Sequence, residues 1–120
     1  MTTVLIIDDE RSIRTILERI LTKDGHTVVT AADGKEGLER LLNQPIPDII
    51  LVDYNMPNVN GGQFLTTIMT QPQYEGYRTI PVIAIGDFPS ESLYLTERLP
   101  KPISAEPLKQ MVRKYCPSNP

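Results

Sequence analysis

Carboxylates stand directly after two apolar segments of this sequence. Residues 4–7 are followed by the run Asp8-Asp9-Glu10, and a second apolar segment ends in Asp53. Adjacent carboxylates repel one another unless a cation relieves the repulsion, and ligand sets made only of oxygen suit Mg²⁺. We therefore expect an acidic pocket that binds a hard divalent cation.

A lysine adds a fixed positive charge to this chemistry. Lys101 follows the short fifth strand expected near 97–99 and precedes Pro102. An ammonium group on one side and a metal ion on the other would cancel the charge of a phosphoryl group from two directions. The sequence therefore indicates a site for a phosphoryl group, provided that the fold brings Lys101 to the acids.

The apolar pattern predicts the elements that must position these groups. Short segments rich in apolar and β-branched residues predict strands at 4–7, 26–31, 48–53 and 80–85. The pattern weakens after residue 86, so a fifth strand can only be short, near 97–99. Apolar residues spaced three and four apart predict helices at 11–23, 33–43, 63–70 and 104–115, with one or two helical turns within 90–95. Alternating strands and helices predict a three-layer α/β sandwich around a five-stranded parallel sheet, whose carboxyl ends share one edge.

Particular residues are expected to begin or end these helices. Gly25 is expected to stop the first helix in a left-handed conformation. Asp33 and Ser104 precede helical patterns and are expected to cap them. Residues 71–79 are expected to form a polar loop.

The composition limits the classes of function. A chain of 120 residues with 40% hydrophobic and 22% charged residues is expected to form one globular domain. The net charge of −3 argues against binding to nucleic acid or anionic lipid. The sequence shows neither an apolar stretch of membrane-spanning length nor a signal peptide. The lone cysteine, Cys116, cannot form an internal disulfide, so a cytoplasmic protein is expected.

Other residues that can do chemistry lack suitable neighbours. His26 has no partner at a metal-ligand spacing and is expected to be structural or exposed, and Cys116 is not expected to be catalytic. The glycines at 61–62 follow no strand and precede no lysine motif, so a turn or helix start is expected there. Tyr74 and Tyr77 either anchor a partner or pack against their own domain.

Four blocks of the sequence together resemble the response-regulator receiver domain of two-component signalling. They are VLIIDDE at 4–10, ILVDYNMP at 50–57 with Gly61 close behind, PVIAI at 81–85, and Lys-Pro-Ile at 101–103. The separation of Asp9 and Asp53 is also typical of that family. The resemblance implies a doubly wound, flavodoxin-like sheet with strand order 2-1-3-4-5, a receiver domain at 1–116, and a tail or linker start at 117–120.

The resemblance implies a role for each matching residue. Asp53 would be the phosphoacceptor, taking a phosphoryl group from a sensor histidine kinase or a histidine phosphotransfer protein. Asp9 would bind Mg²⁺ directly, Asp8 would act through water or hydrogen bonds, and Asp53 and Asn55 would complete the metal site. Lys101 would pair with the phosphate, and the side chain of Asn55 would influence hydrolysis. Such a domain catalyses only its own phosphorylation and dephosphorylation.

The sequence departs from the family after the fourth strand. Receivers usually carry Thr or Ser there, followed by a small residue, but this chain has Gly86 and Asp87. Both stay candidates for phosphate binding, Asp87 through its backbone amide, although its carboxylate would oppose an incoming dianion. Arg98 stands where the family has an aromatic switch residue. The interval from Gly86 to Lys101 is short, so we expect the fourth helix to be shortened or missing.

Two functional hypotheses follow from these observations. One is a phosphorylatable receiver with an altered output surface, whose downstream protein target the sequence does not identify. The other is a pseudo-receiver, which keeps the fold but acts as a protein-interaction module independent of phosphorylation. A phosphatase related to haloacid dehalogenases would need an acid two residues after Asp53, where this chain has Asn55.

Overall fold

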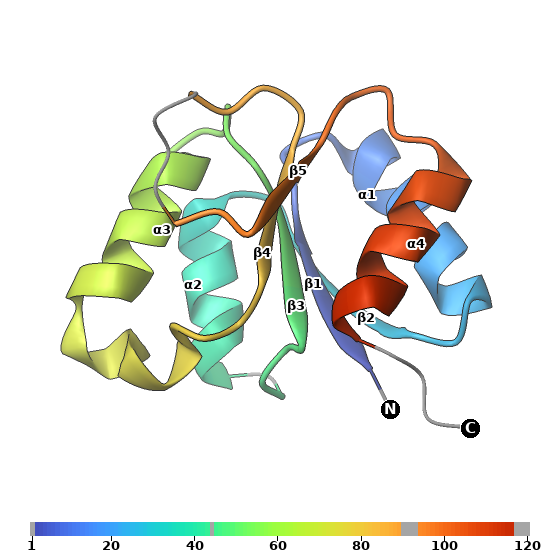
Figure 1. Ribbon diagram of the computed structural model, residues 1–120. Coiled ribbons are helices and arrows are strands. Elements are labelled where there is room, and N and C mark those ends of the chain that lie inside the picture. The colour runs from blue at the N-terminus through green and yellow to red at the C-terminus, as the bar shows by residue number, and fades with distance from the viewer. Residues whose placement is uncertain (1, 44, 90–93, 117–120) are drawn as a thin grey trace.

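A central parallel sheet lies between two layers of helices in the computed structural model of this chain, which describes residues 2–43, 45–89 and 94–116 (Figure 1). The strands are β1 (Thr3–Ile7), β2 (Thr27–Ala31), β3 (Ile49–Asp53), β4 (Val82–Ile85) and β5 (Glu97–Leu99). The helices are α1 (Arg11–Lys23), α2 (Gly34–Asn43), α3 (Gly61–Thr70) and α4 (Ala105–Tyr115), with a 3₁₀ helix, η1 (Pro72–Tyr77). The predicted three-layer α/β class is confirmed.

The strand order is the flavodoxin-like one. The five strands lie in the order β2-β1-β3-β4-β5, and every neighbouring pair is parallel. Helices α1 and α4 cover one face of the sheet, and α2 and α3 cover the other (Figure 1). None of the described helices is long and apolar enough to cross a membrane.

Both faces of the central strands are buried, as the continuous apolar runs predict. On β1, Leu5 and Ile7 belong to the core beneath α2 and α3, whereas Val4 and Ile6 belong to the core beneath α1 and α4. The same alternation continues on β3 and β4. A charged side chain can therefore reach solvent only at the ends of these strands.

The register of the strands fixes which residues meet at that edge. Ile7 is paired with Val52, so the next residues along the two strands, Asp8 and Asp53, lie at the same level. Asp53 is in turn paired with Ile85 on β4. The sheet therefore brings the acids of β1 and β3 and the turn after β4 to one place.

Several element boundaries differ from the predicted ones. Strands β2, β3 and β4 begin one or two residues later than the apolar runs indicate. Helix α3 begins at Gly61, because Asn60 and Gln63 form a capping box: Asn60 Oδ1 accepts the Gln63 N–H at 2.8 Å, and Gln63 Oε1 accepts the Asn60 N–H at 2.9 Å. The segment expected to be a loop at 71–79 contains η1.

The expected helix ends are confirmed at two positions of three. Gly25 has a φ of +92°, in the left-handed region. Asp33 Oδ1 accepts the backbone N–H of Glu36 at 2.8 Å and so caps α2. Ser104 occupies the position before α4, but its side chain makes no capping hydrogen bond.

The connection between β4 and β5 is short. Of the helical turns predicted within 90–95, residues 90–93 lie outside the described part of the chain, and 94–95 are not helical. The described residues of this connection contain no helix, which agrees with the expected shortening of the family's fourth helix. Helix α4 therefore corresponds to the helix that follows the fifth strand in the family.

Gly61 lets α3 begin directly against the end of β3. Its N–H donates to Tyr54 O at 2.9 Å. A Cβ atom at this position would lie 2.5 Å from Asp53 O and 2.5 Å from Phe88 Cζ, closer than such atoms approach. Gly76 in η1 offers a matched contrast, because a Cβ there would meet nothing within 4 Å.

We predict that Gly61→Ala lowers the free energy of unfolding by about 1–3 kcal/mol, because the backbone of Asp53 has no room to move away. Gly76→Ala should change it by less than about 1 kcal/mol, or raise it, because Ala restricts the unfolded chain. Urea denaturation of both variants measures the difference. Equal effects would show that the contact at Gly61 relaxes without cost.

Candidate functional site

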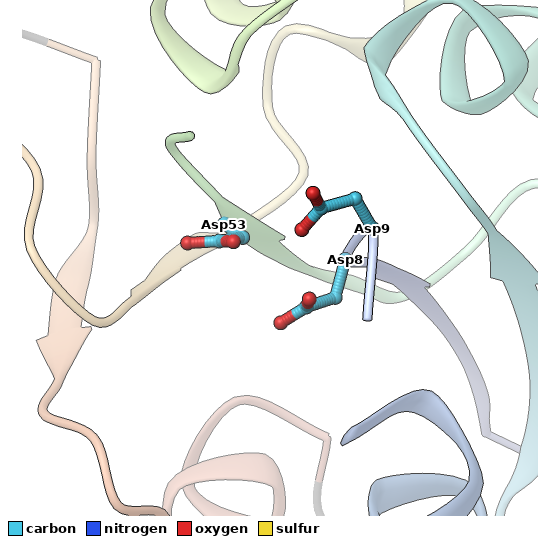
Figure 2. A group of neighbouring side chains, drawn as sticks. All are labelled: Asp8, Asp9 and Asp53. Carbon is cyan, nitrogen blue, oxygen red and sulfur yellow. The ribbon is translucent and has the colours of Figure 1, made fainter. Parts of the chain in front are cut away.

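Three carboxylates meet at the carboxyl edge of the sheet, as the sequence predicts. Asp8 and Asp9 follow β1, and Asp53 is the last residue of β3. Each offers a carboxylate oxygen within 4.8 Å of the other two, and Figure 2 shows the three side chains turned toward a common space. Asp8 is fully buried and Asp53 is 7% exposed, whereas Asp9 is exposed. Glu10 lies outside this group, at the rim.

Lys101 reaches these three acids from the end of β5, the strand at one edge of the sheet. It follows β5, and its Nζ lies 3.1 Å from Asp8 Oδ2 and 3.6 Å from Asp53 Oδ2. The ammonium group is therefore shared between the two buried acids. This placement agrees with the expectation that Lys101 belongs to the site.

Backbone N–H groups orient the two buried carboxylates. Glu10 N–H donates to Asp8 Oδ1 at 2.9 Å, and Tyr54 N–H donates to Asp53 Oδ1 at 2.9 Å. The second oxygen of each acid is left to face Lys101. Asp8 Oδ2 is buried and receives no well-aligned hydrogen bond from the described residues, so it is free to accept a cation as well.

The charges of the site perturb one another. Burial raises the pKa of the Asp53 carboxyl above its ordinary value of 3.8, and the negative charge of Asp8 raises it further. Burial alone would lower the pKa of Lys101, but the close contact with the Asp8 carboxylate, helped by the charge of Asp53, raises it above its ordinary value. The site therefore holds more negative charge than one ammonium group neutralises, which is the condition that favours a divalent cation.

An open pocket of about 350 Å³ lies over these groups. Its lining contains the remaining predicted site residues and is formed by Asp9, Glu10, Asp53, Asn55, Gly86, Asp87, Pro100 and Lys101. Since one water occupies about 30 Å³ in the liquid, the pocket has room for a phosphoryl group and a hydrated ion.

Gly86 forms the wall of the pocket opposite the acids. Its φ is +77°, in the region that side chains with a Cβ rarely adopt. Its N–H donates to Leu99 O at 2.9 Å, and a Cβ at this position would lie 3.2 Å from Lys101 Cδ. A residue with a side chain at this position would therefore be strained by the backbone conformation of the turn and would crowd Lys101.

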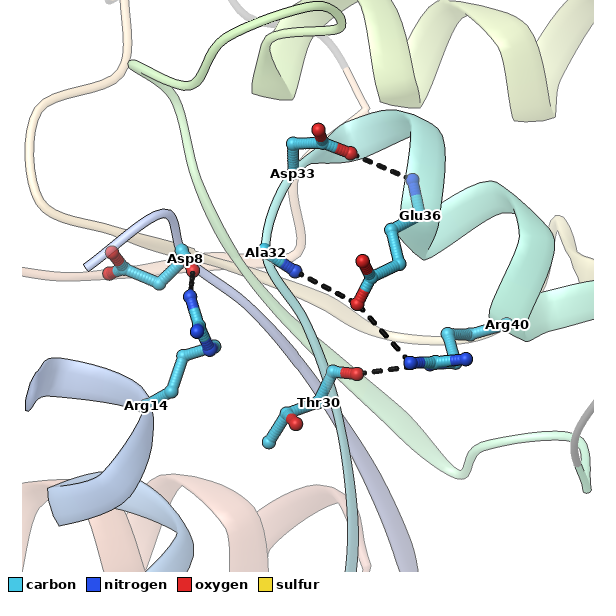
Figure 3. A network of polar contacts seen from close by, with 7 residues as sticks. All are labelled: Asp8, Arg14, Thr30, Ala32, Asp33, Glu36 and Arg40. Carbon is cyan, nitrogen blue, oxygen red and sulfur yellow. Dashed lines mark hydrogen bonds and ion pairs between the residues drawn. The ribbon is translucent and has the colours of Figure 1, made fainter. Parts of the chain in front are cut away.

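The structure adds supporting residues that the sequence reasoning missed. Arg14 of α1 donates to Asp8 O at 2.7 Å, and it fixes the backbone of the buried acid (Figure 3). Asn58 donates from its side chain to Asp33 Oδ2 at 2.8 Å and so ties the loop after β3 to the start of α2. The residue type of Asn58 could have indicated a turn here, because Asn tolerates the positive φ of 67° found at this position.

A second polar network fixes the end of β2 beside the site (Figure 3). Glu36 Oε1 accepts hydrogen bonds from Ala32 N at 3.3 Å and from Arg40 at 3.2 Å. Arg40 Nε donates to Thr30 O at 3.1 Å. These bonds join α2 to the strand that flanks β1, so they hold the scaffold and do not enter the pocket.

The other residues considered from the sequence lie outside the pocket. His26 is buried, with Nε2 3.4 Å from Asp24 Oδ2, which fits a structural role. Burial raises the pKa of the Cys116 thiol to about 11, so it is a poor nucleophile. Tyr74 is only 6% exposed and packs in the core of its own domain, so it is not a partner anchor.

Known proteins share both the sequence pattern and the fold. Residues 4–113 match the family model of the response regulator receiver domain. Sensor histidine kinase CheAY of Helicobacter pylori is 34% identical over 119 residues, which cover 92% of this chain but only 14% of that protein. Chemotaxis protein CheY4 of Vibrio cholerae has a TM-score of 0.82 at 30% identity, covering 96% of this chain and 98% of that one.

A further solved structure shows the same fold. The receiver domain of sensor histidine kinase PA1611 from Pseudomonas aeruginosa has a TM-score of 0.83 and covers 98% of both chains. At 23% identity it is evidence for the fold alone. That structure contains a magnesium ion coordinated in its active site cleft.

We predict that Asp53→Asn raises the free energy of unfolding by about 1 kcal/mol at pH 7 in metal-free buffer. The pKa of Asp53 is higher in the folded chain, so the wild type loses stability as the pH rises above 3.8 through the folded-state pKa. The gain should vanish well below pH 3.8, where the carboxyl is protonated in both states. Urea denaturation at several pH values measures it.

Asp33→Asn is the matched control. The N–H of Glu36 lowers the pKa of Asp33, so removing this charge should reduce stability at pH 7. If both variants are less stable than the wild type, then burial of Asp53 beside Asp8 does not lower the free energy of unfolding of the wild type.

Proposed function

The chain belongs to the response regulator receiver domain family, and on this basis we propose that it accepts a phosphoryl group on Asp53 in a Mg²⁺-dependent reaction. The observation that carries the proposal is the shared ion pair in which Lys101 faces both Asp8 and Asp53. The proposed donor is a phosphohistidine of a sensor histidine kinase or a histidine phosphotransfer protein. Relatives that are themselves sensor kinases support this partner class.

The geometry supports Oδ2 of Asp53 as the attacking atom. Asp53 Oδ1 is held by the N–H of Tyr54, so Oδ2 is the oxygen that faces the pocket. In the proposed reaction Oδ2 attacks phosphorus, a new P–O bond forms, and the N–P bond of the phosphohistidine breaks with its electron pair left on the imidazole. The ammonium of Lys101 lies where it would pair with a phosphoryl oxygen.

The oxygen ligands suit Mg²⁺. Asp9, Asp53 and Asn55 line the pocket, and Asp8 supplies a buried oxygen that lacks an aligned donor. These four residues would hold the ion, which would offset the charge of the phosphoryl group. The PA1611 receiver, which shares the fold, holds a magnesium ion in its active site cleft.

The proposed phosphate-binding groups are Lys101, Asn55 and the turn at Gly86 and Asp87. All of them line the pocket. Gly86 brings no hydroxyl, and its N–H is bonded to Leu99 O, so the backbone N–H of Asp87 is the proposed donor of this turn. The Asp87 side chain is exposed at the rim, where its charge would oppose an approaching dianion.

The same turn favours a second candidate function. The glycine in place of a hydroxyl residue and the added carboxylate suit a pseudo-receiver that binds partners without phosphorylation. In either case we propose a cytoplasmic receiver domain at 1–116 that is not otherwise an enzyme and does not bind nucleic acid or membrane. The tail proposed at 117–120 lies outside the described residues.

We predict that acetyl phosphate with Mg²⁺ adds one phosphoryl group to the wild type and none to Asp53→Asn, because Asp53 lines the pocket as the proposed nucleophile, whereas Asp8 does not line it. Intact-mass spectrometry measures the gain, and omission of Mg²⁺ should abolish it. A wild type that gains no phosphoryl group and shows no Mg²⁺ binding by calorimetry would favour the pseudo-receiver.

We also predict that Asp87→Ala raises the rate of phosphorylation by up to about fivefold, since a charge at about 4 Å in water contributes about 1 kcal/mol of repulsion. The rate with acetyl phosphate should rise most at low ionic strength, where charges are least screened. An unchanged or lower rate would show that Asp87 points away from the phosphoryl group or assists its binding.

A further inference from the structure

One side chain holds two backbone carbonyls of the turn that follows β4. Arg98 Nη1 donates to Phe88 O at 3.1 Å, and Arg98 Nη2 donates to Pro89 O at 2.9 Å. The rigid fork of a guanidinium group suits such a pair of acceptors, and its charge strengthens both bonds. The turn at 86–89 is therefore tied to β5.

The position of Arg98 in the sheet explains how it reaches the turn. Arg98 is paired with Ala84 on β4, so the two side chains leave the sheet on the same face. Ala84 belongs to the core beneath α2 and α3, and its small side chain leaves room for the longer one beside it. An aromatic residue at position 98 could not bond the two carbonyls.

Phe88 connects the same turn to the acceptor. Its ring is 7% exposed and makes an edge-to-face contact with Tyr54, with ring centroids 5.1 Å apart. It also fills the space beside Gly61 that a Cβ would need. Tyr54 directly follows Asp53 and donates its N–H to the acceptor carboxylate. A shift of the Phe88 ring would therefore displace Tyr54 and disturb the hydrogen bond from Tyr54 N–H to the Asp53 carboxylate.

The turn is thus tied to β5 at both of its ends. Gly86 N–H is bonded to Leu99 O, and Phe88 and Pro89 are held by Arg98. Asp87 lies between these anchors and lines the pocket. The wall that faces the acids is built without any contribution from a phosphoryl group.

We propose that Arg98 is a positioning residue, which holds the turn at 86–89 in its phosphate-accepting form before phosphorylation. This proposal rests on the function proposed above and extends it. The clamp stands where receivers carry a mobile aromatic residue, so the pocket wall is preformed and does not assemble on activation.

The test compares Arg98→Ala with Arg78→Ala. Arg78 makes the same kind of clamp, donating from Nε to Ile68 O at 2.8 Å and from Nη2 to Gln71 O at 3.1 Å, but at the end of α3 away from the pocket. Both variants lose two charged hydrogen bonds to carbonyls. Only Arg98→Ala should change the pocket.

Three quantities are measured on each protein: hydrogen exchange of the Gly86 amide, the Kd for beryllofluoride at saturating Mg²⁺, and the Kd for Mg²⁺ alone. In Arg98→Ala we expect exchange about tenfold faster and beryllofluoride binding about tenfold weaker, with the Mg²⁺ affinity unchanged, because the metal ligands lie on β1 and β3. Arg78→Ala should leave all three quantities at wild-type values.

The outcomes separate this proposal from the function on which it rests. Unchanged exchange at Gly86 in Arg98→Ala, or equal changes in both variants, would overturn the positioning role. If the wild type binds no beryllofluoride, the phosphoacceptor function is wrong, whereas exchange at Gly86 still decides whether Arg98 holds the turn. In the wild type, beryllofluoride should move the amide resonances near Arg98 little; a large shift there would also contradict a preformed wall.

Discussion

The ion pair between Asp8 and Lys101 is the interaction on which the whole carboxyl edge depends. Asp8 is fully buried, and an uncompensated buried carboxylate would cost several kcal/mol. Its partner, Lys101, follows β5, whereas Asp8 follows β1. Strands β3 and β4 lie between β1 and β5 in the sheet. The ion pair therefore reaches across the ends of β3 and β4, and the acceptor at the end of β3 lies 3.6 Å from the same ammonium group.

Much of this arrangement follows from short-range patterns in the chain. Continuous apolar runs predict strands buried on both faces, and parallel connections bring their carboxyl ends together. Asp8, Asp9 and Asp53 could be predicted because they stand at the ends of such runs, whereas Lys101 could be predicted because it follows the short fifth strand. Where one residue delimits an element by its own conformation, as at Gly25, prediction also succeeded.

Prediction was weaker where a residue acts through a partner that is distant in sequence. Arg98 was recognised only as a missing aromatic residue, since its bonds to Phe88 and Pro89 depend on the local path of the turn. The bond from Asn58 to Asp33 joins two loops that only the folded sheet brings together. The start of α3 was predicted too late for another reason. The Asn60 and Gln63 spacing of a capping box is visible in the sequence, so the correct start could have been predicted.

The left-handed backbone at Gly86 restricts how this pocket could be redesigned. A hydroxyl residue at this position would be strained at a φ of +77°, and its Cβ would crowd Lys101. The turn would first need a different path, which Arg98 opposes through its two bonds. Installing a switch hydroxyl therefore requires coupled changes at both positions, and each single change alone is disfavoured.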